Sequence, residues 1–259
     1  MPEHFPSQKA LPGFLQRQGR AFLLALGFLT RLGPAMPATN REMALSCAYY
    51  PLAGAVLGAV LILTFALGFF AGQPWAQAWL YVLLSAWLTR ALHLDGLTDL
   101  LDALGSGKSG DAFQAVLKDS RMGAFGCAGL ILALAGQIIL AAACLQHGRL
   151  APLLCAPVFG RCLPILLAVI APPNPKASLG ALLAAAPKTT ALLIAAAGLA
   201  ASIFHLAPAG ALVAISLAAL CLWKLRQTAL AQNGYNGDFC GAAVVIGETA
   251  FLLAAGTAV

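Results

Sequence analysis

Long apolar stretches that contain almost no charged residue run through most of this chain, and they limit what it can fold into. Hydrophobic residues make up 61% of the 259 positions, and charged residues make up only 9%. A water-soluble domain carries about 25% charged residues, because its surface must be hydrated. Too few charges remain here to cover a water-exposed surface, so lipid has to be the solvent for most of the chain.

The length of these stretches predicts transmembrane helices, since a helix needs about 20 apolar residues to cross a bilayer. Strands of a membrane barrel would alternate in polarity, which these stretches do not. Phe22–Leu32 is too short to span, so we interpret it as an interfacial or re-entrant segment. We therefore predict a single domain over residues 1–259, an all-α polytopic membrane helix bundle of about seven spans (six to eight). The predicted spans are Cys47–Ala71, Trp75–Leu94, Gly123–Leu145, Pro152–Ala171, Lys188–Leu206, Pro208–Trp223 and Phe239–Ala258.

Two polar interruptions separate the apolar stretches, one from about Asp95 to Arg121 and the other from Lys224 to Asp238. An even number of predicted spans lies between them, so both should face the same side of the membrane. That side also receives most of the Lys and Arg residues, whereas the other receives Arg149 and little else. Basic loops stay in the cytoplasm, which places both interruptions there. The net charge of +6 comes without a basic run, so nucleic acid is not an expected partner.

Acidic residues are concentrated in the first interruption, where Asp95, Asp99 and Asp102 stand at positions i, i+4 and i+7. On a helix this spacing puts the three carboxylates on one face, where they repel one another. Hard oxygen ligands without a matching His and Cys set favour Mg²⁺ or Mn²⁺ as the cation that offsets them. The alternative is an ordinary solvated helix face. His93, alone at a helix end, is more typical of a hydrogen-bonded structural residue than of a catalyst.

Lys118, Ser120 and Arg121 follow at the entrance of the next span, beside Asp119 and a glycine. Cations, a hydroxyl group and backbone N–H groups in one short segment suit phosphate oxygens. A charged membrane anchor would have a similar composition, so both interpretations stay open.

The second interruption ends in a turn rich in Gly and Asn, and Asp238 stands after it at the entrance of the last span. Glu248 lies inside that apolar span, where an unpaired carboxylate is costly. Arg161 is a cation inside another span. A structural pair between Arg161 and a carboxylate and a substrate contact of Arg161 are equally compatible with the sequence.

Five segments together resemble the cobalamin synthase family, also called adenosylcobinamide-GDP ribazoletransferase. They occur in the family's order and extend over nearly the whole chain; those of His93 and Lys118 are the most specific. The segments are Phe28-Leu29-Thr30-Arg31-Leu32, Tyr50-Pro51-Leu52-Ala53-Gly54, His93-Leu94-Asp95-Gly96-Leu97-Thr98-Asp99, Lys118-Asp119-Ser120-Arg121-Met122-Gly123 and Gly237-Asp238-Phe239-Cys240-Gly241-Ala242.

The resemblance implies a bacterial inner-membrane transferase whose active site faces the cytoplasm. It would transfer adenosylcobinamide phosphate from adenosylcobinamide-GDP to the ribose hydroxyl of α-ribazole or α-ribazole 5′-phosphate, with release of GMP and a requirement for Mg²⁺. The small-molecule substrates and the lipid bilayer are its expected partners, and a homo-oligomer stays open. We expect metal ligation by Asp95, Asp99, Asp119 and Asp238 with Asp102 in support, phosphate binding by Lys118, Ser120, Arg121 and Arg161, and catalytic roles for His93, Asp95, Asp99 and Asp119.

Two other classes of protein stay as alternatives. A CDP-alcohol phosphatidyltransferase would perform related chemistry, but Asp95-Gly96 lacks the Ala-Arg that follows in that family. An ion-coupled transporter binds cations at mid-depth in the membrane, whereas most acidic residues here lie at one face. The general base for the acceptor hydroxyl is either His93 or a carboxylate.

The predicted topology can be tested by single-cysteine labelling in a cysteine-free variant. Lys108→Cys and Asn233→Cys should react with an impermeant reagent from the cytoplasmic side only, because both polar interruptions are predicted there. Gly148→Cys should react from the opposite side. Labelling of positions 108 and 233 from different sides would disprove the even number of spans between them.

Overall fold

The computed structural model describes residues 13–256, and within that range it contains twelve α-helices and no strand. The helices are α1 (Phe14–Leu29), α2 (Asn40–Cys47), α3 (Tyr50–Ala66), α4 (Pro74–Leu88), α5 (Leu92–Gly105), α6 (Asp111–Leu117), α7 (Ala124–Gln146), α8 (Ala151–Ile170), α9 (Ser178–Ala184), α10 (Lys188–Ile203), α11 (Pro208–Ala231) and α12 (Gly237–Gly256). The end of the predicted span Phe239–Ala258 lies outside the described residues. Whether residues 1–259 form a single domain stays a prediction.

Four helices are long and apolar enough to cross a membrane, namely α7, α8, α11 and α12. The count rises to six if the bent pairs α2–α3 and α9–α10 are each one span. The all-α polytopic class is therefore confirmed, but four to six candidate spans lie at or below the lower limit of the predicted six to eight. The predicted span Trp75–Leu94 is not one helix, because α4 ends at Leu88 after 15 residues. That is shorter than the roughly 20 residues that cross a bilayer.

The break between α4 and α5 is fixed by an unusual backbone conformation. Arg90 and Ala91 have φ values of 56° and 55°, in the left-handed region that residues other than glycine rarely adopt. The Arg90 guanidinium donates hydrogen bonds to the carbonyl oxygens of Gly27, Phe28 and Thr30 at 2.6–3.1 Å. Arg90 thus binds the free carbonyl groups at the end of α1 and holds that helix against the break.

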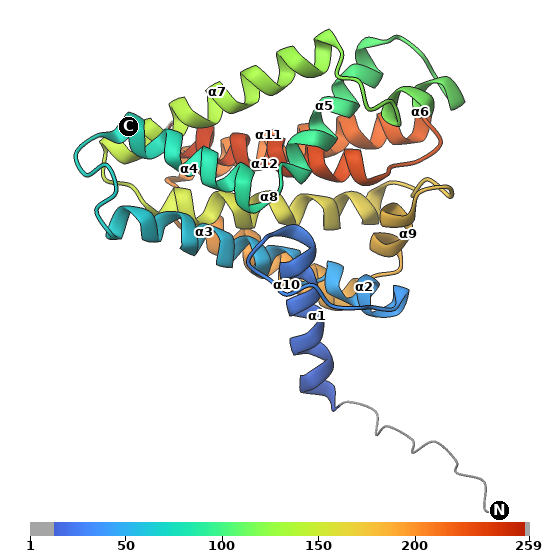
Figure 1. Cartoon of the computed structure of the whole chain (residues 1–259), viewed down its shortest axis with the longest axis horizontal. Coiled ribbons are helices and arrows are strands. Elements are labelled where there is room, and N and C mark those ends of the chain that lie inside the picture. The colour runs from blue at the N-terminus through green and yellow to red at the C-terminus, as the bar shows by residue number, and fades with distance from the viewer. Residues whose placement is uncertain (1–12, 257–259) are drawn as a thin grey trace, which may run out of the picture.

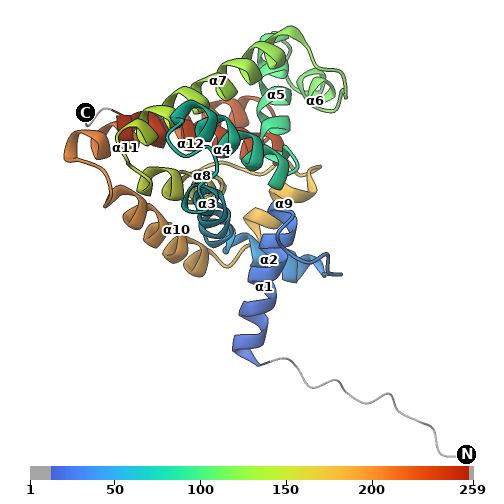
Figure 2. The same ribbon diagram turned by 60° about the vertical axis from the view of Figure 1, so that its left-hand side comes forward.

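Residues 22–29 of the predicted segment Phe22–Leu32 form the second half of α1, a 16-residue helix that is not among the candidate spans, and residues 30–32 follow its end. Its N-terminal half projects away from the bundle (Figures 1 and 2). Phe14 and Leu15 are exposed there, whereas Leu24 and Leu29 are buried. That the segment is interfacial or re-entrant stays a prediction.

Helices α8 and α12 form the centre of the bundle, and α3, α5, α7, α10 and α11 pack against one or both of them (Figure 2). Glycine allows backbones to approach closely at these contacts. A Cβ on Gly54 or Gly58 of α3 would lie within 2.5 Å of a carbonyl oxygen of α8. In α12, a Cβ on Gly247 would lie 3.2 Å from the Cα of Gly160 in α8. The alanine and glycine content of the sequence therefore serves tight helix packing.

Two prolines inside α8 leave backbone carbonyls without their usual helical donors. Pro157 has no N–H to give to Leu153, four residues earlier. The hydroxyl of Tyr81 in α4 donates to that carbonyl oxygen instead, at 2.8 Å. A proline that would weaken an isolated helix thus creates a specific contact between two helices.

The two polar interruptions meet at one end of the bundle. The backbone N–H of Gly110 donates to the side chain of Gln232 at 2.8 Å, and the Gln114 side chain donates to the Gln232 carbonyl at 2.8 Å. Figure 1 shows both segments at the same end, with the α7–α8 turn at the other. The expectation that the interruptions share a side is met.

Replacement of Tyr81 by Phe should lower the thermal unfolding temperature, because the buried Leu153 carbonyl loses its donor. Leaving such a group unsatisfied costs about 1–3 kcal/mol. Adding Pro157→Ala to the Tyr81→Phe variant should recover much of that loss, since an alanine at this position supplies the missing helical N–H. Unfolding of the purified single and double variants in one detergent measures both effects. Equal destabilisation of the two variants would show that the Leu153 carbonyl is not the source of the loss.

Candidate active site

Helix α5 carries the acidic face predicted from the sequence. It begins directly after the strained break, and its buried side includes Leu97, Leu100 and Ala103. On the other side Asp95 is exposed, while Asp99 and Asp102 are partly exposed. The apolar side of α5 packs into the bundle, so its carboxylates face outward at the end of the bundle where the polar interruptions meet.

Helix α12 crosses α5 at a contact between glycines. A Cβ on Gly96 would lie 3.0 Å from both the Cα and the carbonyl oxygen of Asp238, and one on Gly241 would lie 3.1 Å from the carbonyl oxygen of His93. The two backbones therefore touch, which larger residues would prevent. This crossing places Asp238 beside Gly96. In the sequence of α5, Gly96 lies between Asp95 and Asp99. The two acidic segments, distant in sequence, are thus brought together.

The start of α12 is organised by Asn236. Its side-chain oxygen accepts hydrogen bonds from the N–H groups of Asp238 and Phe239 at 3.1 and 3.3 Å, and its amide nitrogen donates to Asp238 at 2.7 Å. The turn before it has positive φ values at Asn233 (61°) and Gly234 (99°). Asn236 therefore orients the Asp238 carboxylate as well as the helix, a role that the sequence analysis missed.

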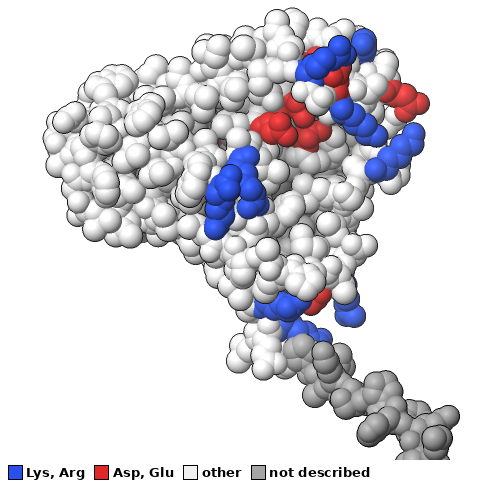
Figure 3. Space-filling model, viewed as in Figure 1, with Lys and Arg blue, Asp and Glu red and all other residues white. Residues whose placement is uncertain are grey.

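The carboxylates affect one another electrostatically. Burial, followed by the charges of Asp95, Asp238 and Asp102, raises the pKa of Asp99 to about 6. Figure 3 shows acidic side chains gathered at one place on this face of the molecule, with basic side chains around them. A cation beside Asp99 would relieve the repulsion between the carboxylates.

Asp102 has a structural partner that the sequence did not reveal. Its two carboxylate oxygens accept hydrogen bonds from the backbone N–H groups of Gly123 and Gly126, both at 2.7 Å. These N–H groups lie at the start of α7, where a helix leaves donors free and favours negative charge. Asp102 thus fastens α7 to α5 with both oxygens, and its predicted support of a metal stays a prediction.

The loop before α7 carries the predicted phosphate-binding cations. Arg121 makes a two-pronged ion pair with Asp119, with N–O distances of 2.9 and 2.7 Å, and its side chain is 86% exposed. Hydrogen bonds from Arg121 lower the pKa of Asp119 to about 2. Lys118 and Ser120 are also exposed. The bonds of Asp102 to Gly123 and Gly126 tie this loop to the acidic face of α5.

His93 and Arg161 lie apart from the exposed acidic face. His93 is 8% exposed and Arg161 is 2% exposed. Arg161 forms a buried ion pair with Glu248, which is the structural pairing left open by the sequence. Gln137 of α7 is close to Glu248 as well, at 3.4 Å. The sequence analysis missed Gln137, although a buried amide in an otherwise apolar helix was a signal.

Within residues 13–256, no three His, Cys, Asp or Glu side chains are placed closely enough to enclose a metal ion. The acidic face of α5 and Asp238 nevertheless lie side by side at the crossing of α5 and α12. Their donors are hard carboxylate oxygens from two helices, the type that suits Mg²⁺ bound partly by water and substrate phosphate.

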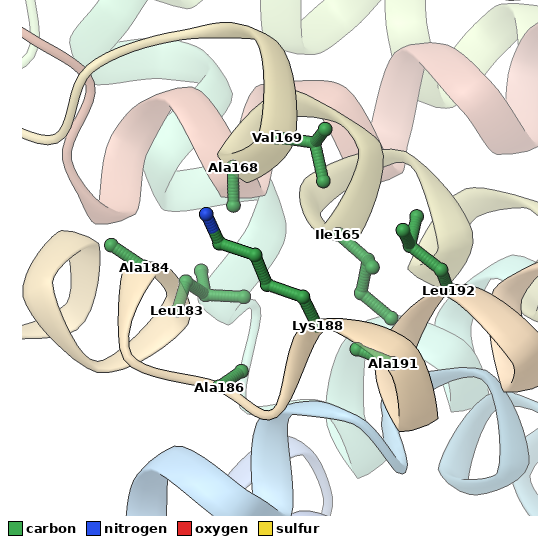
Figure 4. Close-up of a pocket in the computed structure, with 9 residues that line it drawn as sticks. All are labelled: Ile165, Ala168, Val169, Leu183, Ala184, Ala186, Lys188, Ala191 and Leu192. Atoms are coloured by element: carbon green, nitrogen blue, oxygen red, sulfur yellow. The ribbon is translucent and has the colours of Figure 1, made fainter.

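A separate apolar pocket lies between α8, α9 and α10 (Figure 4). Ile165, Leu183 and Leu192 line it, and the Lys188 side chain crosses it. None of the predicted site residues is among those that line it. The acidic face of α5 is therefore the better candidate for chemistry on a charged substrate.

Fold and site together define a polytopic membrane protein with an acidic site at one end of its helix bundle. The chain matches the model of the family described as cobalamin-5-phosphate synthase over residues 21–256, and it belongs to that family. It is 44% identical to the adenosylcobinamide-GDP ribazoletransferase of Nitratidesulfovibrio vulgaris strain Miyazaki F, over 94% of this chain and 97% of the relative. The protein of that name from Brevibacillus brevis is 30% identical over 90% and 96%. No solved structure gives a significant match.

The glycine contact between α5 and α12 can be tested by substitution. Gly96→Ala should destabilise the protein by about 1–3 kcal/mol, because the added methyl group meets backbone atoms that cannot move independently. Gly136→Ala in α7 is the matched control, since nothing lies within 4 Å of its Cβ position. Thermal unfolding in one detergent compares the two. Equal unfolding temperatures would show that the backbones are not in contact at Gly96.

Proposed function

We propose that the chain transfers adenosylcobinamide phosphate from adenosylcobinamide-GDP to the ribose hydroxyl of α-ribazole or α-ribazole 5′-phosphate. The main support is the 44% identity to an adenosylcobinamide-GDP ribazoletransferase along nearly the full length of both chains. Family membership favours this activity over that of a CDP-alcohol phosphatidyltransferase or a transporter.

In the proposed reaction, the ribose hydroxyl oxygen forms a bond to the phosphorus of the adenosylcobinamide phosphate group. The bond from that phosphorus to the GMP oxygen breaks, GMP leaves, and a site carboxylate takes the hydroxyl proton. The meeting of α5 and α12 supports this chemistry, because it assembles carboxylates beside exposed cations at one end of the bundle.

Asp95, Asp99 and Asp238 are the residues that we assign to Mg²⁺. Bound there, Mg²⁺ would neutralise charge on the phosphate oxygens. The assignment is supported by the raised pKa of Asp99, which is caused first by burial and then by the negative charges of Asp95, Asp238 and Asp102. Asn236 would fix the orientation of Asp238, since it already binds one of its oxygens.

Lys118, Ser120 and Arg121 are assigned to the substrate phosphates. Their exposure leaves room for a large ligand, and Asp119 fixes the direction of the Arg121 guanidinium. In this arrangement Asp119 serves the phosphate side of the site more directly than the metal side. Arg161 is not included, because it is buried and paired with Glu248.

The surroundings of the enzyme follow from its charge distribution. We place the acidic site at the cytoplasmic face of a bacterial inner membrane, because the basic residues gather on that side of the predicted spans. Apolar side chains on α7 and α11, such as Leu132, Ile131 and Leu212, are exposed and suit contact with lipid. A homo-oligomer stays a prediction.

Asp99→Asn tests the metal assignment, because it keeps the side chain's size and removes its charge. With adenosylcobinamide-GDP, α-ribazole and Mg²⁺, GMP release should fall below a tenth of the wild-type rate, a loss of more than about 1.4 kcal/mol in transition-state stabilisation. Asp111→Asn is the matched control, since Asp111 is an exposed acid outside this face. A wild-type protein that releases no GMP would refute the proposed function. An active Asp99→Asn variant would refute only the metal role.

A further inference from the structure

Four polar side chains from four different helices meet inside the bundle, and we call them the buried polar cluster: His93 (α5), Gln137 (α7), Arg161 (α8) and Glu248 (α12). Arg161 pairs with one carboxylate oxygen of Glu248, and the Gln137 amide lies 3.4 Å from the other. All four line one small cavity between α4, α5, α7, α8 and α12. None of the four belongs to the exposed acidic face.

The pair of Arg161 and Glu248 is costly to bury. Their side chains are 2% and 12% exposed. Removing charges from water often costs more than the pair regains, and well-packed apolar residues frequently replace such a pair without loss of stability. Ionisable residues inside membrane proteins are accordingly rare and tend to be functional. Stability alone therefore does not explain the pair.

His93 has an incomplete set of hydrogen bonds. Its Nε2 atom is buried, and no partner for it exists among the side chains and backbone of residues 13–256. Buried polar atoms almost always have a partner, from the protein or from ordered water. The cavity has about 20 Å³ of space for the centre of a water molecule and is lined by several polar groups. Both conditions for a bound water are met.

His93 also stands at the crossing that assembles the acidic face. Its carbonyl oxygen lies 3.1 Å from the Cβ position of Gly241 in α12. Asp95 follows two residues later, and Asp99 follows one turn after that. A hydrogen bond that holds the His93 ring inside the bundle therefore fixes the rotation of the first turn of α5, and with it the direction of the carboxylates.

We propose that the cavity holds a water molecule that joins His93 to the pair of Arg161 and Glu248, and that the buried polar cluster positions the acidic face of α5. In this role His93 is a positioning residue and not the general base. The proposal rests on the proposed function only where turnover is measured, because the unfolding and deuterium-exchange measurements do not depend on it.

Substitutions at His93 separate the two roles. A glutamine amide can place a hydrogen-bonding nitrogen or oxygen near the Nε2 position but cannot act as a base near neutral pH. His93→Gln should therefore retain more than a tenth of the wild-type kcat, whereas His93→Leu should fall below a hundredth. If His93→Gln is as inactive as His93→Leu while α5 amides exchange with deuterium at the wild-type rate in both, His93 is the base and the proposal is overturned.

The double variant Arg161→Met with Glu248→Leu tests the ion pair. Each single variant leaves one charge buried without its partner and should unfold at a lower temperature, whereas the double variant should unfold close to wild type. Deuterium exchange of the peptide that covers α5 should nevertheless be at least tenfold faster, with kcat at least tenfold lower and KM for adenosylcobinamide-GDP within about twofold. Ser202→Ala is the control, because Ser202 is a buried polar residue whose hydroxyl donates to carbonyl oxygens of Gly198 in α10 and Cys155 in α8, away from the buried polar cluster. A double variant with wild-type exchange in α5 would overturn the proposal, whether or not the enzyme turns over.

Discussion

The contact on which the site depends is the crossing of α5 and α12 at Gly96 and Gly241. Backbone meets backbone there, so Asp238 is placed beside Gly96 without any flexible side chain between the helices. Carboxylates repel one another, and no attraction between them would assemble this face. The free energy that holds them together has to come from packing elsewhere, chiefly from the buried contacts of α12 with α8. Helix packing therefore assembles the acidic site against the mutual repulsion of its carboxylates.

Hydrogen bonds at the helix ends around the site hold these helices in place. Arg90 joins the end of α1 to the strained break before α5, and Asp102 joins α5 to the start of α7. Both use a charged side chain to satisfy backbone groups that a helix end leaves free. The uncharged side chain of Asn236 accepts hydrogen bonds from two such N–H groups at the start of α12. Three helix ends near the carboxylates are thus fixed by side chains, which hold the irregular segments between these helices in place.

Hydropathy predicted the helices that cross the bundle, because burial in lipid leaves a long apolar signal. Gly123–Leu145 and Pro152–Ala171 agree with α7 and α8 within a residue or two. The break at Arg90 was missed because a left-handed backbone at two non-glycine residues leaves no mark in composition. The spacing of Asp95, Asp99 and Asp102 predicted the acidic face of α5, because residues at i, i+4 and i+7 lie on one side of a helix. The backbone partners of Asp102 could not be predicted, and for Arg161 a carboxylate pair could only be left open beside a substrate contact, since both depend on which helices become neighbours.

Charge is handled in two different ways within one bundle. Arg161 and Glu248 lie between apolar helices and neutralise each other, so that part of the protein has no need of an outside ion. Asp95, Asp99 and Asp238 meet at the end of the bundle, where no basic side chain forms an ion pair with them among the described residues. A bundle selected for stability alone would pair these carboxylates too. They lie close together without such a partner, and their mutual repulsion is a cost in free energy that the packing of the surrounding helices has to offset.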